Sequence, residues 1–295
     1  MARRNLIQLP RLQSSDLNGW PKKDANIILL LEIMLVLFIF LMNSADVTLH
    51  QESYHFHLSG FLVPYLQHFN TPSLQVLERI GWWGHILVVF GFLTYLSYSK
   101  HLHIIFAFIN TYFANTQPRG KIENMPAITE EVKSMLGISE DTANAGSISD
   151  FGSNDVFNLS WKNLLDAYTC TECGRCTEVC PANLTGKKLS PRKIMMDIRD
   201  RADDVGKKLD MGSDAFCIDK NAPLSPANFN DGLSLFSVIS PEELHACTTC
   251  NACVEACPVL INPLEPIIKM RRYEILTMSS GPADWVPLFN SLENN

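Results

Sequence analysis

Two copies of one cysteine motif constrain the fold of this chain more than any other feature. The pattern Cys-x2-Cys-x2-Cys-x3-Cys-Pro begins at Cys170 and again at Cys247, so eight of the nine cysteines lie in two groups. Grouped cysteines of this kind indicate metal binding rather than a disulfide framework. Zinc sites usually draw their four ligands from two pairs of residues, whereas this pattern offers two runs of four thiols. The chain is therefore expected to fold around two metal centres.

The spacing within each motif matches that of bacterial ferredoxins that hold two [4Fe–4S] clusters. Three closely spaced thiolates bind three irons of one cubane, and the displaced fourth cysteine reaches the other cubane. Cluster 1 is therefore expected to bind Cys170, Cys173, Cys176 and Cys257. Cluster 2 is expected to bind Cys247, Cys250, Cys253 and Cys180. Cys217 stands alone between the motifs and is interpreted as a buried or incidental thiol.

Capping signals predict that the two motifs lie in an all-helical domain. Ser160, Ser190 and Ser240 each precede a helical pattern, and the last of them is part of a capping box. A further helix is expected from Asn262–Pro263 to about Met278. This scaffold resembles the α-helical ferredoxin fold of the iron–sulfur proteins in succinate dehydrogenase and heterodisulfide reductase.

Two apolar segments in the first third of the chain predict membrane-spanning helices. The spans are expected at about residues 26–46 and 81–99, which fits the hydrocarbon core of a bilayer. Trp82 and Trp83 at one end of the second span suit an interfacial aromatic belt. Glu32 is interpreted as a carboxylate that reaches the interface or faces a partner helix, with a proton or quinone site as the alternative. Other spanning helices, from a partner chain or a second copy, are expected to complete the bundle.

Charge sets the expected orientation of the chain. Basic residues precede the first span and follow the second, whereas the segment between the spans contains only Arg79. The positive-inside rule then places both ends in the cytoplasm and residues of about 44–80 outside. The net charge is −7, and the acidic excess lies in the C-terminal half. This excess argues against nucleic acid as a partner.

Histidines gather around the second span. His85 and His103 are 18 residues apart, a whole number of helical turns, so one continuous helix would place them on one face about 27 Å apart. Such a pair could hold two haems stacked across the membrane, because histidine is a common axial ligand. The same spacing also fits a bundle-facing His85 with interfacial His101 and His103.

Residues 84–108, GHILVVFGFLTYLSYSKHLHIIFAF, resemble the last helix of the nitrate reductase gamma subunit family. They also resemble related membrane domains fused to heterodisulfide-reductase-like iron–sulfur proteins. The resemblance implies that His85 and His103 are haem b ligands. In that family the opposing ligands come from an earlier helix, and here no histidine precedes His50. We therefore expect another chain to share the haem ligands, or the haems to be lost, or the sequence to lack its original N-terminus.

The expected organisation has three parts. Residues 1–114 form a membrane domain, and residues 115–155 form a polar linker with one short helix near Thr129–Leu136. Residues 156–295 form the ferredoxin domain. The fold class is thus all-α, with two transmembrane helices followed by a cytoplasmic α-helical ferredoxin domain that holds two cubane clusters.

Residues 158–201 and 270–295 resemble membrane-bound, heterodisulfide-reductase-like Fe–S oxidoreductases of bacteria. In those systems a cysteine-rich CCG domain usually follows, fused or as a separate subunit. This sequence has no such motif, so the catalytic half is expected elsewhere. The resemblance implies an electron-transfer subunit of a respiratory oxidoreductase in the bacterial inner membrane. Its partners would be a CCG-domain or flavin-containing subunit on the cytoplasmic side, and haem b or quinone in the membrane.

Two other function classes explain less of the sequence. A membrane anchor, an assembly scaffold or a redox sensor would hold the clusters without passing electrons onward. A complete enzyme would need its own substrate site. The sequence shows no nucleotide-binding glycine loop, no nucleophile constellation and no metal-ligating set apart from the cysteines. We therefore expect no catalytic residues in this chain.

Overall fold

A computed structural model describes residues 9–13, 15–17, 19–50, 57–118, 120–138, 151–219 and 224–294. The chain divides into two compact units, Met1–Leu102 and His103–Asn295. All regular structure in these described ranges is helical, apart from one isolated antiparallel bridge between Cys217 and Phe229. The prediction of an all-α fold is confirmed. The division falls before α5 (His103–Tyr112), a helix that was expected in the membrane domain.

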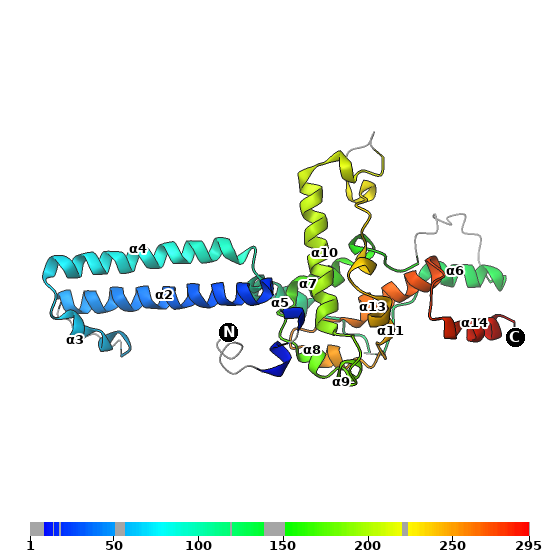
Figure 1. Cartoon of the computed structure of the whole chain (residues 1–295), viewed down its shortest axis with the longest axis horizontal. Helices are drawn as coiled ribbons and strands as arrows, with labels where there is room; N and C mark the ends of the chain where they lie inside the picture. The colour runs from blue at the N-terminus through cyan, green and yellow to red at the C-terminus, as the bar shows by residue number, and fades with distance from the viewer. Residues whose placement is uncertain are drawn as a thin grey trace. The chain divides into compact units, whose positions relative to one another are not determined.

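The first unit is a helical hairpin. Its long helices α2 (Trp20–His50) and α4 (Thr71–Leu96) lie side by side, and the short α3 (Val63–Leu66) is part of their connection (Figure 1). By length and composition, both long helices could cross a membrane. The unit buries few of their side chains, as expected for helices that are surrounded by lipid. Two long apolar helices at the predicted places are therefore present.

Both helices extend beyond the predicted spans. The second begins at Thr71 rather than near residue 81, because the Asn70 side chain accepts a 3.2 Å hydrogen bond from the Ser73 backbone N–H. A proline in the first helical turn favours the same start. The helix ends at Leu96, and a turn then leads to the 3₁₀ segment Lys100–Leu102. Hydropathy marks the apolar part of a helix and does not mark its capped ends.

Two glycines allow the hairpin helices to approach closely. A Cβ atom at Gly81 would lie 2.7 Å from the backbone nitrogen of Met42, and one at Gly84 would lie 2.6 Å from the ring of Phe38. Small residues at such positions let helix backbones pack tightly in a membrane. The glycines therefore fix the crossing of α2 and α4.

Polar contacts close both ends of the hairpin. The Tyr95 hydroxyl donates to the carboxylate of Asp24 at 2.7 Å, and Asp24 is 2% exposed. Lys100 lies 3.9 Å from the same carboxylate. At the other end, the buried Ser44 hydroxyl donates to the carbonyl of Ser59 at 2.8 Å. Each of these pairs joins residues far apart in the sequence, so they set the register of the hairpin.

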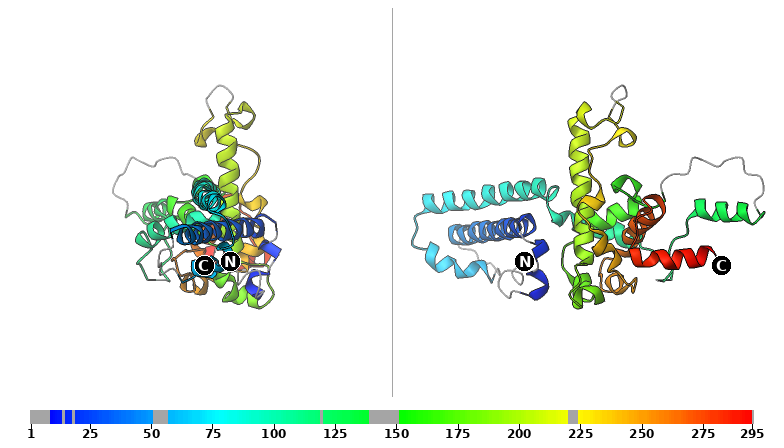
Figure 2. Two further views of the ribbon diagram at one scale, coloured as in Figure 1. Left: turned by 90° about the vertical axis from the view of Figure 1, so that its left-hand side faces the viewer. Right: turned by 45° about the vertical axis from the view of Figure 1, so that its right-hand side comes forward.

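The second unit consists of short helices and one long helix, α10 (Pro191–Met211), which stands out in Figure 2. The other helices are α5, α6 (Pro126–Met135), α7 (Trp161–Thr169), α8 (Arg175–Glu178), α9 (Pro181–Leu184), α11 (Pro241–His245), α12 (Ala252–Glu255), α13 (Leu264–Arg272) and α14 (Val286–Glu293). Within the described ranges of both units, the 3₁₀ segments are Pro10–Leu12, Ser15–Leu17, Ser59–Phe61, Lys100–Leu102, Val156–Asn158, Asp214–Phe216, Pro226–Asn228, Leu235–Ser237 and Ala283–Trp285. A shared apolar core, to which α10 contributes Ile194 and Ile198, holds this unit together.

The predicted helix starts in this unit are confirmed. Ser160 caps α7, Ser190 caps α10 and Ser240 caps α11, and each side chain accepts from a backbone N–H three residues later. The helix expected after Asn262 is α13, which continues into a π-helical turn at Tyr273–Thr277. The short helix expected in the linker is α6.

The last part of the expected linker packs against α13. The Ser153 N–H donates to the carbonyl of Lys269 at 3.0 Å, and the Phe151 N–H donates to the hydroxyl of Thr277 at 3.2 Å. Gly152 has a φ of +99° and no room for a Cβ atom against the α13 backbone. Residues 151–155 are therefore part of the folded unit, while residues 139–150 of the expected linker lie outside the described residues.

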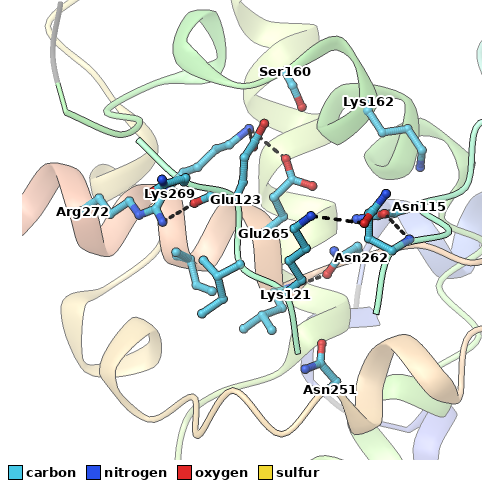
Figure 3. Close-up of a pocket in the computed structure, with 15 residues that line it drawn as sticks. Asn115, Lys121, Glu123, Ser160, Lys162, Asn251, Asn262, Glu265, Lys269 and Arg272 are labelled. Atoms are coloured by element: carbon cyan, nitrogen blue, oxygen red, sulfur yellow. Dashed lines mark hydrogen bonds and ion pairs between the residues drawn. The ribbon is translucent and has the colours of Figure 1, made fainter. Parts of the chain in front are cut away.

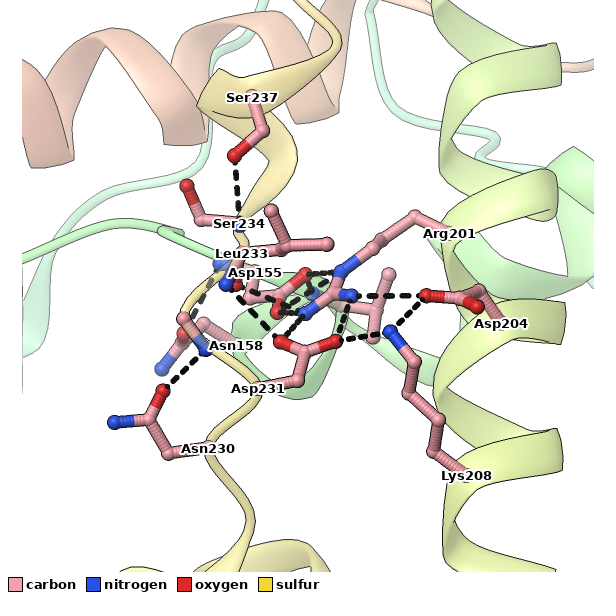
Figure 4. Close-up of polar contacts among 12 residues, drawn as sticks. Asp155, Asn158, Arg201, Asp204, Lys208, Asn230, Asp231, Leu233, Ser234 and Ser237 are labelled. Carbon is pink, nitrogen blue, oxygen red and sulfur yellow. Dashed lines mark hydrogen bonds and ion pairs between the residues drawn. The ribbon is translucent and has the colours of Figure 1, made fainter. Parts of the chain in front are cut away.

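A buried ion-pair network fastens this segment to α10 (Figure 4). Arg201 is 6% exposed and contacts Asp155 at 2.5 Å and Asp231 at 2.6 Å. Lys208 contacts Asp231 at 2.7 Å. The hydrogen bonds from Arg201 hold the pKa of Asp231 well below its usual range. The stabilisation from the Asp231 carboxylate is therefore complete above the ordinary carboxyl pKa and is lost as the pH falls through the lowered one.

Replacement of Arg201 by methionine should destabilise the second unit strongly. The change would leave the carboxylate of Asp155 buried without its cation and would leave Asp231 with Lys208 alone, and breaking a buried ion pair typically costs about 3–5 kcal/mol. Thermal unfolding of the purified full-length protein in detergent should show a much lower midpoint for Arg201→Met. Lys207→Met is the matched control, because Lys207 lies on the same helix outside the network. Equal midpoints for the two variants would contradict this account of the network.

Replacement of Gly81 by valine should open the membrane hairpin. The added side chain would collide with the backbone of Met42, as the Cβ distance already shows. We expect Gly81→Val to lose monodispersity in mild detergent, measured by size-exclusion chromatography after heating. Gly91→Val on the same helix is the control, since no atom lies within 4 Å of a Cβ at Gly91. A Gly91→Val variant as unstable as Gly81→Val would rule out this close approach as the cause.

Candidate iron–sulfur site

The first cysteine motif is a loop held between short helices. Cys170 directly follows α7, Cys176 lies in α8 and Cys180 directly precedes α9. Glu172 and Gly174 have φ angles of 58° and 79°, in the left-handed region that turns the chain sharply. The loop thereby bends its cysteines around a common centre.

The second motif repeats the same backbone path. Thr249 and Asn251 stand at the positions equivalent to Glu172 and Gly174, and their φ angles are 56° and 60°. A threonine rarely adopts this conformation, so the surrounding structure must impose it. Cys253 then lies in α12 as Cys176 lies in α8. The repeat in the sequence is therefore also a repeat in structure.

The two motifs together surround two hollows. The cysteines that line the first hollow are Cys170, Cys173, Cys176, Cys253 and Cys257. The cysteines that line the second hollow are Cys180, Cys247, Cys250 and Cys253. Each hollow thus receives cysteines from both motifs, and Cys253 lies at both. Among the residues that the structure describes, no three His, Cys, Asp or Glu side chains are close enough to hold a single metal ion.

The chemistry of these donors fits two [4Fe–4S] clusters. Burial raises the pKa of Cys170, Cys176 and Cys253 to about 12. Burial also raises the pKa of Cys247 and Cys257. Thiols with such pKa values are protonated at neutral pH, so iron must displace their protons and its charge must then compensate the buried thiolates. The donor set is therefore suited to a metal cofactor and poorly suited to remain ionised without one.

Arginines supply positive charge beside both hollows. The Arg271 guanidinium donates to the carbonyls of Leu244 and Cys247, the latter at 2.6 Å, and burial lowers the pKa of Arg271. The side chain of Arg192 is 1% exposed and lines the first hollow. Neither arginine was predicted as part of the site. Their helices were predicted, but no local pattern indicates which helix face points toward the cysteines.

The candidate haem ligands lie in different units. His85 is half-buried in α4, with its Nδ1 atom 3.2 Å from the carbonyl oxygen of Leu35 on α2. His103 is the first residue of α5. Since α4 ends at Leu96, the expectation that both histidines share one face of a continuous helix is wrong. Any role of either histidine must be argued separately.

A cavity of about 550 Å³ lies beside the cysteine motifs in the second unit (Figure 3). Its lining includes the cations Lys121, Lys162, Lys269 and Arg272, the carboxylates Glu123 and Glu265, and Asn251 from the second motif. Lys269 pairs with Glu265 at 2.8 Å. This cavity was not predicted from the sequence, because its walls come from the linker, α7, α13 and the second motif.

Comparison with known proteins matches the cysteine-rich region to a described family. Residues 169–261 match the family model for a 4Fe-4S dicluster domain. This range contains all eight cysteines of the two motifs. No solved structure matches the chain.

Curated relatives extend the similarity toward the N-terminus. A "Probable iron-sulfur-binding oxidoreductase FadF" of Bacillus subtilis is 34% identical over 74% of this chain and 31% of its own length. An "EtfAB:quinone oxidoreductase" of Syntrophomonas wolfei is 27% identical over 84% of this chain and 34% of its own length. A "Probable membrane-anchored ferredoxin" of Chromohalobacter salexigens is 28% identical over 74% of this chain and 31% of its own length. The chain therefore spans about a third of the length of these relatives. It carries a 4Fe-4S dicluster domain preceded by two long apolar helices.

Proposed function

We propose that this chain is an electron-transfer subunit of a membrane-bound respiratory oxidoreductase. In this proposal Cys170, Cys173, Cys176 and Cys257 bind cluster 1. Cys247, Cys250, Cys253 and Cys180 bind cluster 2. The observation that carries the proposal is that each hollow receives cysteines from both motifs and that Cys253 lies at both. Two clusters bound there would be close neighbours, as single-electron transfer between centres requires.

The surrounding residues set the conditions for that transfer. Each bound [4Fe–4S] cluster supplies one-electron chemistry at a potential that depends on charge, hydrogen bonding and burial. Cys170 and Cys180 are buried, which limits the access of water to their thiolates, and Arg271 places a positive charge beside Cys247. A cation in that place favours the more negative, reduced state of cluster 2. The chain's own contribution is thus to hold, insulate and electrostatically tune the electron carriers.

The partners are proposed from similarity. The relative named "EtfAB:quinone oxidoreductase" supports a flavoprotein partner on one side and quinone on the other. A CCG-domain or flavin-containing subunit would bind the iron–sulfur unit, and quinone or haem b would exchange electrons in the membrane. Basic residues around the apolar helices support a cytoplasmic iron–sulfur unit on the bacterial inner membrane.

His85 is the stronger candidate for a haem ligand. A carbonyl oxygen only accepts hydrogen bonds, so the contact with Leu35 requires a proton on Nδ1 of His85. That tautomer leaves Nε2 as the metal-binding nitrogen, the arrangement usual for ligating histidines. In the proposal another chain supplies the opposing ligand, and His103 is a second, independent candidate.

Serine substitutions should reveal which cysteines share a cluster. Cys180→Ser and Cys250→Ser should damage the same cluster, although they lie in different motifs. Each variant should keep about four of the roughly eight irons of the full protein. Their remaining EPR spectra, recorded on the anaerobically purified full chain after reduction, should be the same. Cys257→Ser and Cys173→Ser should share the other spectrum.

The control for this series is Cys217→Ser, because Cys217 lines neither hollow. It should keep the full iron content and both EPR signals. If the Cys180→Ser spectrum instead matches that of Cys173→Ser, each motif holds its own cluster and the exchanged assignment is wrong. Loss of iron from Cys217→Ser would also count against the assignment.

A reduced-minus-oxidised optical spectrum of the purified membrane complex should show a b-type haem band. His85→Ala should remove that band while the iron–sulfur content is retained, because the two sites use different ligands. His68→Ala is the control, since His68 is exposed. A complex that contains iron–sulfur clusters but shows no haem band would mean that His85 has a structural role. Clusters whose redox state no quinone or electron donor changes would favour the anchor, scaffold or sensor alternative.

A further inference from the structure

Helix α5 presents a large apolar face to the outside of the second unit. His103, Phe106, Ala107 and Asn110 recur at the spacing of one helix face, on which Asn110 is buried and the other three are partly buried. Phe106 lies edge-on to Tyr168 of α7, with ring centroids 6.5 Å apart. An ordinary surface helix covers its apolar face and presents a polar one to water. The opposite face of α5 does not follow this rule.

The outer face of α5 is lined by large apolar and aromatic side chains. The exposed residues on it are Ile104, Ile105, Phe108, Ile109 and Tyr112. Phe108 is 77% exposed and Tyr112 is 83% exposed. The patch continues through Phe113 to Trp161 at the start of α7, whose rings meet edge to face at 5.1 Å. An apolar patch this concentrated marks a contact surface.

We infer that this outer face of α5, together with Phe113 and Trp161, lies in the headgroup region of the membrane and makes cluster 1 the membrane-side cluster. The second half of this inference rests on the proposed function. Chain connectivity selects lipid as the occupant. Only residues 97–102 separate α5 from α4, and six residues extend at most about 22 Å. If the second apolar helix crosses the membrane, a connection this short keeps the start of α5 close to the membrane surface.

The composition of the face also fits a lipid interface. Tryptophan and tyrosine concentrate at the headgroup level, where an apolar ring and a polar atom are both accommodated. Interfacial helices bury a face of this kind just below the headgroups. Ile104, Ile105 and Ile109 would lie on the acyl side of that boundary, and the hydroxyl of Tyr112 would reach the headgroups.

The inner face ties α5 to both chain segments that carry the cluster 1 cysteines. Asn110 is fully buried, and its amide donates to the carbonyl of Val259, two residues after Cys257, at 2.9 Å. Lys162 on α7 donates to the side-chain oxygen of Asn110, also at 2.9 Å. The last residue of α7 precedes Cys170 directly.

Both of these hydrogen bonds connect α5 to chain segments that lead to cluster 1 cysteines rather than to cluster 2 cysteines. Val259 follows a cluster 1 cysteine, and Lys162 lies on the helix that leads to another. Neither bond ends beside Cys180 or Cys247, which belong to cluster 2 in the proposed assignment. A membrane surface on the outer face of α5 would therefore lie closer to cluster 1. Electrons would pass between the membrane and cluster 1, and between the soluble partner and cluster 2.

The first test reconstitutes the full chain in vesicles of phosphatidylcholine brominated on its acyl chains. Bromine should quench the emission of Trp161, obtained as the difference between the wild type and Trp161→Phe. Phe108→Glu should reduce that quenching, since it places a charge on the lipid-facing surface. Met211→Glu is the matched control, because Met211 is 72% exposed at the end of α10. It should leave the quenching unchanged.

The second test determines which cluster lies nearer the membrane and which lies nearer the soluble partner. A nickel-chelating lipid places a paramagnetic ion at the headgroups and speeds the EPR relaxation of nearby centres. Cys180→Ser retains cluster 1 in the proposed assignment and should show the larger enhancement. Cys257→Ser retains cluster 2 and should show the smaller one. A reversed or equal pair of enhancements would overturn the assignment of sides.

The outcomes separate this inference from the proposed function. Unquenched Trp161 in vesicles would overturn the lipid-facing surface and point to a protein partner on α5. Quenched Trp161 in a chain whose clusters no donor can reduce would leave the surface intact and refute electron transfer instead.

Discussion

The second unit depends on gathering thiols from two distant motifs around two adjoining hollows. Burial makes several of these thiols costly to ionise, as the raised pKa values of Cys170 and Cys253 show. The hollows are therefore stable in their charged form only when metal compensates the thiolates. Because each hollow takes cysteines from both motifs, neither motif can complete its site alone. The residues between the motifs, including α10, must therefore bring the second motif back beside the first. The ion pairs of Arg201 on α10 with Asp155 and Asp231 hold these segments together.

The features that could be predicted from the sequence are those encoded within a few residues. Ser160, Ser190 and Ser240 begin helices because a side chain caps a backbone N–H three residues away. The cysteine motifs were equally readable, since their spacing is a local property and residues 169–261 match a dicluster family. Even the shared backbone path of the two motifs follows from their identical spacing.

The features that could not be predicted depend on contacts between distant residues. The cavity beside Asn251 and the pairing of Arg201 with Asp155 bring together segments that no local pattern connects. The start of α4 was missed for a different reason. Asn70 and the proline in the first turn are a readable cap, but they lie outside the apolar run that defined the span.

Helix α5 belongs to the second compact unit, although residues 1–114 were expected to form the membrane domain. Both α4 and α5 are rich in apolar residues, and only the short polar stretch SYSKHLH at residues 97–103 separates the two runs. What distinguishes α5 is its polar inner contact. Asn110 is buried against Val259 and Lys162, and an amide buried in this way needs partners that only a folded protein unit supplies. Its position in the second unit thus follows from one satisfied polar side chain, while its outer face keeps the apolar character of the helices before it.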